Sequence, residues 1–143
     1  MGPDQNFEKE RQKELLRQKE LRQQRELQNY YDKYTVTING LMWEDVERSR
    51  TVNRTWQEAR AYCKSLKLLG FDDWRLPALT ELESILDKSR FPALKKEFHK
   101  ISISYMEYWT SARKGDHAIT VSFRQGWRHS EPLYRYNKVR CVR

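Results

Sequence analysis

Residues 70–87, GFDDWRLPALTELESILD, lie between two segments whose apolar residues recur at helical spacing. The first segment opens with a capping box, Thr55–Glu58, and we expect its helix to stop at Gly70. The second helix is expected to begin at residues 78–80, directly after Pro77. The stretch therefore predicts a joint between two helices.

The motif at the centre of this joint is predicted to be structural. Trp74 would plug the joint, the Arg75 guanidinium would satisfy loop carbonyls with its five donors, and Pro77 would fix the entry to the second helix. Asp72 and Asp73 are expected to bracket the turn by accepting hydrogen bonds from backbone amides. We do not expect a catalytic acid pair, because the sequence offers no nucleophile or second catalytic partner nearby.

Short strands are expected on both sides of these helices. Val36 and Ile38 alternate with threonines, and Asn39-Gly40 predicts a hairpin turn into a second strand at residues 41–45. Three later strands are expected at residues 105–112, 118–127 and 137–143. The order of hairpin, two helices and further strands indicates an α+β fold.

Residues 1–34 differ in composition from the rest of the chain. From Phe7 to Tyr34 there is no Gly or Pro, and the phrase RQKELLRQKELRQQREL consists almost wholly of strong helix formers. We therefore expect one long charged helix over residues 1–34 and a folded domain over residues 35–143. No heptad seam runs along the whole helix, so its role stays open between a solvated stalk and a helix for self-association or a partner.

The net charge of +8 belongs almost entirely to the domain, because residues 1–34 carry eight Lys/Arg and seven Asp/Glu. The basic excess has two interpretations: solubility alone, or an anionic partner such as an acidic polysaccharide, lipid head groups or nucleic acid. No stretch approaches the roughly 20 apolar residues of a membrane span. The start, Met1-Gly2-Pro3, has no signal-peptide core, and we expect a targeting segment or anchor to have been removed.

Five motifs occur in order along the domain: GLMWED, WQEARAYCKSLKLLGFDDWRLPALTELESILD, YWTSA, AITVSF and VRCVR. Over residues 40–143 they resemble the Lcl C-terminal domain, a bacterial family typified by the C-terminal domain of the Legionella collagen-like adhesin and formerly a domain of unknown function. DWRLP before a helix and a final RC strand are also similar to the formylglycine-generating-enzyme branch of the C-type-lectin-like fold. The resemblance implies a C-type-lectin-like domain. The family usually has Thr at the position of Ala78, so the second helix loses a cap worth about 1 kcal/mol.

C-type-lectin-like domains resemble one another in a disulfide between the first helix and the last strand. The resemblance implies this bridge between Cys63 and Cys141, the two cysteines of the chain. On the chain-entropy account it would stabilise the fold by roughly 4–5 kcal/mol. It would also require an oxidising compartment, so we expect the periplasm or cell surface; two buried free thiols in a cytosolic protein are the alternative.

The sequence offers no motif for catalysis or for a cofactor. His99, His117 and His129 are far apart and lack ligand spacing, so they are expected to be surface residues rather than metal ligands. A Gly-rich phosphate loop, a Gly-x-Ser-x-Gly elbow and a Cys-x-x-Cys pair are all absent. Glu131-Pro132-Leu133 does not fit a calcium lectin, because leucine cannot supply the amide oxygen that the ion and sugar require. We expect no enzyme activity, no cofactor and no metal.

Basic and aromatic residues gather in the C-terminal part of the domain. The long loop region is the usual recognition surface of C-type-lectin-like folds, and guanidinium groups beside aromatic rings suit sulfated or carboxylated sugars. The predicted ligand-binding residues lie on loops and strand ends: Arg113, Lys114, Arg124, Trp127, Arg128, His129, Tyr134, Arg135, Tyr136 and Lys138. Ordinary solvated strand edges are the alternative.

These features predict a non-catalytic binding module of the bacterial periplasm or cell surface. The family's adhesin is associated with glycosaminoglycan binding, which makes an anionic glycan or a host or envelope ligand the expected partner. The alternative is a structural or assembly protein of the envelope that grips another protein through the domain and the N-terminal helix. Nucleic-acid binding is a third hypothesis, weakened by the expected disulfide and the lack of a recognition motif.

Overall fold

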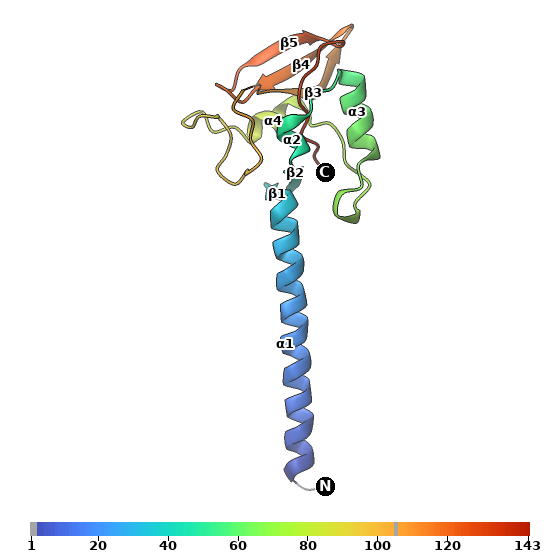
Figure 1. Ribbon diagram of the computed structural model, residues 1–143, viewed down its shortest axis with the longest axis vertical. Coiled ribbons are helices and arrows are strands. Elements are labelled where there is room, and N and C mark those ends of the chain that lie inside the picture. The colour runs from blue at the N-terminus through green and yellow to red at the C-terminus, as the bar shows by residue number, and fades with distance from the viewer. Residues whose placement is uncertain (1–2, 105) are drawn as a thin grey trace. The chain divides into compact units, whose positions relative to one another are not determined.

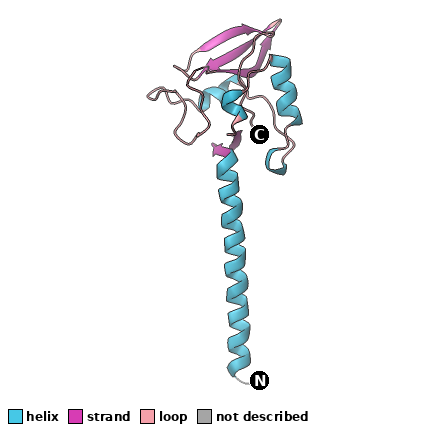
Figure 2. Cartoon of the chain, in the orientation of Figure 1, coloured by secondary structure: helices cyan, strands magenta, loops and turns pink. Residues whose placement is uncertain are grey.

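The computed structural model describes residues 3–104 and 106–143 and divides the chain into two compact units, Met1–Lys33 and Tyr34–Arg143 (Figure 1). The first unit contains the helix α1 (Pro3–Tyr34), which confirms the long N-terminal helix. The second unit contains the remaining helices and all the strands of the described chain (Figure 2). These elements confirm the α+β class.

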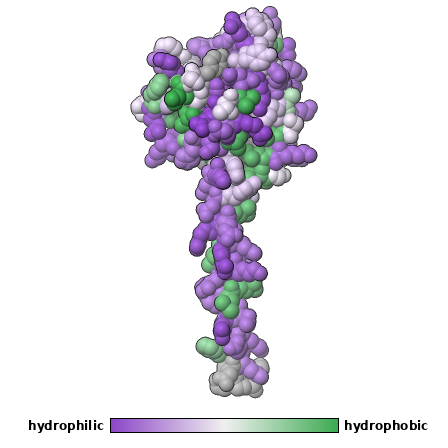
Figure 3. Space-filling view, viewed as in Figure 1, coloured by the Kyte–Doolittle hydropathy of each residue, from purple (hydrophilic) through white to green (hydrophobic). Residues whose placement is uncertain are grey.

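Helix α1 carries ion pairs along its surface, between Glu8 and Arg11, Glu10 and Lys13, and Glu14 and Arg17. Six of its large apolar side chains are each at least half exposed: Phe7, Leu15, Leu16, Leu21, Leu27 and Tyr30. On the face seen in Figure 3, green hydrophobic patches along this helix are separated by purple hydrophilic residues. Among residues 3–104 and 106–143, no helix is both long and apolar enough to cross a bilayer.

The domain opens with the expected hairpin. Strands β1 (Thr35–Ile38) and β2 (Leu41–Glu44) pair in antiparallel fashion. The two turn residues, Asn39 and Gly40, have φ values of 53° and 78°. A tight two-residue turn needs positive φ at both positions, which Asn and Gly adopt at low cost.

Helix α2 (Arg48–Thr51) and helix α3 (Trp56–Ser65) follow the hairpin. The Thr55 hydroxyl accepts the Glu58 amide at 3.3 Å and the Glu58 carboxylate accepts the Thr55 amide at 3.0 Å, so the expected capping box is confirmed. The helix ends earlier than Gly70, because the backbone is extended at Leu66. A 3-10 turn, η1 (Leu68–Gly70), then carries the chain into the joint.

Helix α4 (Leu79–Ser84) begins where the sequence predicts, with Ala78 at its N-cap. Ala78 has no side-chain acceptor, so only half of a capping box forms: the Ala78 amide donates to Glu81 Oε1 at 2.8 Å. Leu82 and Ile85 are fully buried. The helix packs against β3 and β4, whereas α3 packs against β3 (Figure 1).

The main sheet has the order β3-β4-β5 and is antiparallel throughout: β3 (Glu107–Lys114), β4 (His117–Ser122) and β5 (Arg128–Pro132). Two expectations are corrected here. The strand predicted at residues 118–127 ends at Ser122, and β5 was not predicted. Residues 137–143 form isolated bridges rather than a regular strand.

These C-terminal residues tie the domain together. Val142 bridges Trp43 of β2 on one side and Arg75 of the joint on the other. The neighbouring Cys141 is bonded to Cys63 of α3, with the two Cα atoms 5.5 Å apart. The implied disulfide is therefore present.

Two hydrophobic clusters form the core. One contains Trp43, Leu82, Ile85, Leu94, Phe98, Tyr108, Val121, Phe123 and Val142 among its members. The other lies beneath α3 and contains Trp56, Ala59, Cys63, Leu66, Trp74, Leu76, Trp109, Ala118, Val139 and Cys141. The second cluster therefore packs against both α3 and the joint and fixes their positions in the domain.

Candidate functional site

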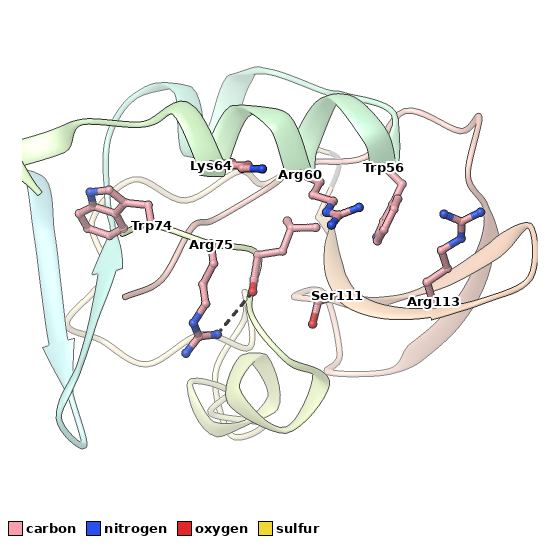
Figure 4. Close-up of a pocket in the computed structure, with 8 residues that line it drawn as sticks. Trp56, Arg60, Lys64, Trp74, Arg75, Ser111 and Arg113 are labelled. Carbon is pink, nitrogen blue, oxygen red and sulfur yellow. Dashed lines mark hydrogen bonds between the residues drawn. The ribbon is translucent and has the colours of Figure 1, made fainter. Parts of the chain in front are cut away.

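A pocket of about 520 Å³ opens between α3, the joint and β3 (Figure 4). Four of its eight lining side chains are cationic and none is acidic. The lining, here called the basic pocket, consists of Trp56, Arg60, Lys64, Trp74, Arg75, Leu76, Ser111 and Arg113. The charge and the concave shape together suit an anionic ligand.

Helix α3 supplies one wall of the basic pocket. Trp56, Arg60 and Lys64 are four residues apart along the helix, so they lie on one face. Ala59 and Cys63 are fully buried on the adjacent face, which anchors the helix to the core. Arg60 and Lys64 thus extend into solvent from a fixed backbone.

The Trp56 ring lies between two guanidinium groups. The Cζ atoms of Arg60 and Arg113 lie 5.7 and 5.3 Å from its centroid, and Figure 4 shows them on opposite sides of the ring. Trp56 is only 5% exposed and donates Nε1 to the Thr110 carbonyl at 3.0 Å. Arg113 also donates Nε to the Gly115 carbonyl at 2.9 Å. These contacts hold the Arg113 guanidinium in place and leave its Nη groups for a ligand.

Arg75 differs from the other three cations because it is already paired. Its two Nη atoms lie 2.7 and 2.8 Å from the two carboxylate oxygens of Glu81. This pairing raises the pKa of Arg75 and lowers that of Glu81. In the described ranges, neither Arg60, Lys64 nor Arg113 forms an ion pair with a carboxylate. The available positive charge of the pocket therefore comes from these three residues.

A family model for the Lcl C-terminal domain matches residues 34–143. The chain belongs to the Lcl C-terminal domain family. No curated protein matches the chain. The family match begins at the boundary between the two units, so α1 precedes the Lcl domain.

Within the Lcl domain, two residues of the joint have main partners that the sequence did not predict. The contact from Arg75 to a loop carbonyl, that of Leu76, is long at 3.5 Å, because the guanidinium points to Glu81 instead. Asp73 pairs with Arg143, at 2.5 and 3.2 Å, where it was expected to bracket the turn through backbone amides. Trp74 is 3% exposed and donates to the Leu68 carbonyl at 3.3 Å, which is consistent with a plug.

The predicted ligand-binding residues do not gather in one place. Arg113 and Lys114 pair with the first residues of β4, whereas Arg128 pairs with Val121 near its other end. Those ends are about 15 Å apart along a strand of this length. Arg124 and Trp127 lie in the turn before β5, and Tyr134, Arg135 and Tyr136 follow β5. Of the predicted set, only Arg113 lines the basic pocket.

Three of the predicted residues are engaged within the domain. Arg128 binds both carboxylate oxygens of Glu83, at 2.7 and 2.8 Å. The His129 Nδ1 atom lies 2.6 Å from Glu107 Oε1. Lys138 was expected on an exposed loop or strand end, but it is buried, with 3% of its surface exposed. Its Nζ atom donates a hydrogen bond to the Asn53 side chain at 3.1 Å, and burial lowers the pKa of Lys138. Its backbone bridges Tyr108 of β3, which draws the residue into the core.

The sequence analysis did not select Trp56, Arg60, Lys64 or Ser111 as site residues. The spacing of Trp56, Arg60 and Lys64 was a usable signal, since it predicts one helix face with an aromatic residue and two cations. The signal was incomplete because β3 brings Ser111 and Arg113 to this face from more than 45 residues later in the chain.

Proposed function

We propose that this Lcl domain is a non-catalytic binding module for a sulfated or carboxylated glycan, and that the basic pocket is its ligand site. The carrying observation is the group of three cations, Arg60, Lys64 and Arg113, that have no carboxylate partner in the described chain and face one cavity. Guanidinium groups bind sulfate and carboxylate in a bidentate manner, which gives both affinity and orientation.

The role of Trp56 in this proposal is to position the cations. The ring is almost completely buried, so a sugar cannot stack on its full face. The ring instead holds Arg60 and Arg113 by cation–π contacts. Because these long side chains are already restrained, they lose less conformational entropy when a ligand binds. Ser111, exposed at the rim, supplies a hydroxyl for neutral sugar groups.

The proposed setting is the periplasm or the cell surface. The disulfide between Cys63 and Cys141 supports it, because such crosslinks persist in oxidising compartments and are rare in the cytosol. Acidic glycans are abundant at cell surfaces, so the location and the ligand class agree.

The test is calorimetric titration with a size-defined heparin oligosaccharide and its desulfated counterpart, at low and at physiological salt. We expect the sulfated form to bind and R60A/R113A to weaken binding by about tenfold or more. The matched control is R124A/R135A, which removes the same charge from exposed residues outside the pocket. The control should lose only the part of the affinity that depends on net charge.

Two outcomes would contradict this proposal. If wild type fails to bind the sulfated oligosaccharide at low salt, the ligand class is wrong. If the control loses as much affinity as the pocket variant, or if duplex DNA binds as tightly as the glycan, the protein responds only to charge.

A second candidate function is assembly with another envelope protein through α1. It is favoured by the six apolar side chains of α1 that are at least half exposed. Sedimentation of the full chain and of L15Q/L16Q/L27Q tests it for self-association. Wild type should form a larger species than the variant. If both sediment as monomers, the hypothesis of self-association is excluded.

A further inference from the structure

Three side chains of types that can ligate a metal ion lie close together on the main sheet, and none of them lines the basic pocket. Glu107 lies on β3, whereas His129 and Glu131 lie on β5. One donor atom from each lies within 4.8 Å of the donor atoms of the other two. His129 Nδ1 and Glu107 Oε1 are already 2.6 Å apart.

The strand register explains why these residues meet. His129 and Glu131 are two residues apart on β5 and therefore point to the same face of the sheet. On the central strand their neighbours are Thr120 and Ala118, whose small side chains leave room between β3 and β5. The sequence gives no motif for this group, because Glu107 is far from His129 along the chain.

The position of Glu107 is fixed by a second contact. Thr120 donates its hydroxyl to Glu107 Oε2 at 3.1 Å, which leaves Oε1 directed at His129. Hydrogen bonds of this kind orient carboxylate ligands in metal sites. The Glu107 side chain is 19% exposed and that of His129 is 42% exposed, so the group is open to solvent on one side.

Protein cations compensate the two carboxylates only in part, since Arg135 acts on Glu131 through its charge without forming an ion pair with it in the described chain. Across residues 3–104 and 106–143, no Lys or Arg forms an ion pair with Glu107 or Glu131. The only ion-pair partner of Glu107 in that part is His129, and this partner is itself a metal ligand when neutral. A divalent cation at this point would neutralise both carboxylates.

We propose that Glu107, His129 and Glu131 form a binding site for a divalent transition-metal ion, with Zn²⁺ as the best chemical match. An imidazole nitrogen with two carboxylate oxygens suits Zn²⁺, whereas Ca²⁺ and Mg²⁺ prefer sets made of oxygen alone. The metal replaces the proton between His129 and Glu107, and this proton is released to solvent. Around a tetrahedral ion the donor atoms lie about 3.4 Å from one another, so His129 Nδ1 and Glu107 Oε1 must move apart from 2.6 Å to admit the metal. The fourth position stays open.

The experiment is a titration of the full chain, free of any polyhistidine tag, with ZnCl₂ against a chromophoric chelator. We expect H129N and E131Q each to bind Zn²⁺ at least about tenfold more weakly than wild type. Cobalt substitution gives a second measurement, because a visible absorption band in wild type should disappear in both variants. Circular dichroism checks that each variant is folded.

The matched control is H117N. His117 also sits beside a carboxylate, with Nδ1 2.9 Å from Asp116 Oδ1, but it belongs to no group of three donors in the described chain. H117N should therefore bind Zn²⁺ as wild type does. The proposal is overturned if folded wild type does not bind Zn²⁺, or if H129N and E131Q bind it as tightly as wild type. A loss confined to H117N would overturn it as well. None of these results depends on glycan binding.

Discussion

Arg140 and Asp45 form an ion pair in the interior of the domain, with Nη1 2.9 Å from Oδ1 and side chains that are 0% and 1% exposed. Asp45 also accepts the backbone amides of His99 and Lys100, each at 3.0 Å. Arg140 donates to the carbonyls of Glu44 and Lys100 at 2.8 and 2.6 Å. The pair thereby joins the end of the hairpin, the loop at residues 99–100 and the C-terminal segment.

Breaking this pair should be costly. D45N would leave the buried Arg140 charge without its partner, and we expect the free energy of unfolding to fall by about 3–5 kcal/mol in urea denaturation. D73N is the matched control, because it breaks the exposed pair with Arg143 and should leave stability almost unchanged. Equal effects of the two substitutions would mean that the buried pair has no special role.

The disulfide should dominate the stability of the domain. Reduction of the Cys63–Cys141 bond, which spans 78 residues, should lower the free energy of unfolding by roughly 4–5 kcal/mol. C63A and C141A should each lose about as much as the double variant, since either one removes the crosslink. Alkylation of both thiols in denatured, unreduced protein from an oxidising compartment would contradict the bond.

Glu44 should make the domain less stable as pH rises. Burial raises its pKa above 4.5, against the opposing hydrogen bonds from Tyr62 and Cys141 and the charge of Arg140. A raised pKa in the folded state gives stability that is present below the unfolded value and is lost as pH rises through the folded one. Wild type should therefore lose stability relative to E44Q as pH rises above the ordinary range of a carboxyl group, as measured by urea denaturation.

Glu58 is the control with the opposite sign. Its bonds to Thr55 lower its pKa, so its contribution is present above the unfolded pKa and is lost as pH falls. Wild type should lose stability relative to E58Q on acidification. The same slope for both variants would show that neither residue determines the pH dependence.

Restoring a cap at α4 should stabilise the protein. In A78T the hydroxyl can accept the Glu81 amide, while Glu81 already accepts the amide of residue 78. We expect a gain of about 0.5–1 kcal/mol in thermal or urea unfolding. T55A should cost about 1 kcal/mol at α3, and a loss of stability in A78T would mean that Thr does not fit this turn.

If the basic pocket binds anions, removal of Glu81 should strengthen binding. E81Q frees Arg75 from its ion pair, while the amide oxygen can still accept the Ala78 amide. Affinity for a sulfated oligosaccharide should rise severalfold and depend more steeply on salt. The control is the same substitution in R75A, where it should have little effect. Tighter binding in that background would show that Arg75 is not the residue released.

Local chemistry made much of the fold predictable. Asn39-Gly40 and the Thr55–Glu58 box act over two to four residues, so the hairpin and the start of α3 could be located from the sequence. Strand β5 could not, because Arg-His-Ser-Glu-Pro has little strand propensity and is held by its pairing with β4. Residues 137–143 show the reverse case: their pattern resembles a strand, but their bridge partners lie on four different segments, at Trp43, Arg54, Arg75 and Tyr108.

The candidate site was less predictable than the fold, because it depends on contacts between residues that are distant in the sequence. Clustering of Arg, Lys and aromatic residues along the C-terminal sequence says nothing about which of them share a face. Arg128 and Lys138 bind Glu83 and Asn53 of the domain itself, and Arg113 lines the basic pocket with residues of α3 instead of with the other predicted residues. Such groupings depend on which distant carboxylate or backbone group each cation meets.

The bridges made by Val142 and Cys141 also set a time order for folding. β2, α3 and the joint all need these residues as partners, so none of the three is complete until residue 142 has left the ribosome. We therefore expect the domain to close as one unit only after these residues have been made. A translocation channel accepts an unfolded precursor, so late closure would allow export first and oxidation of the two thiols second.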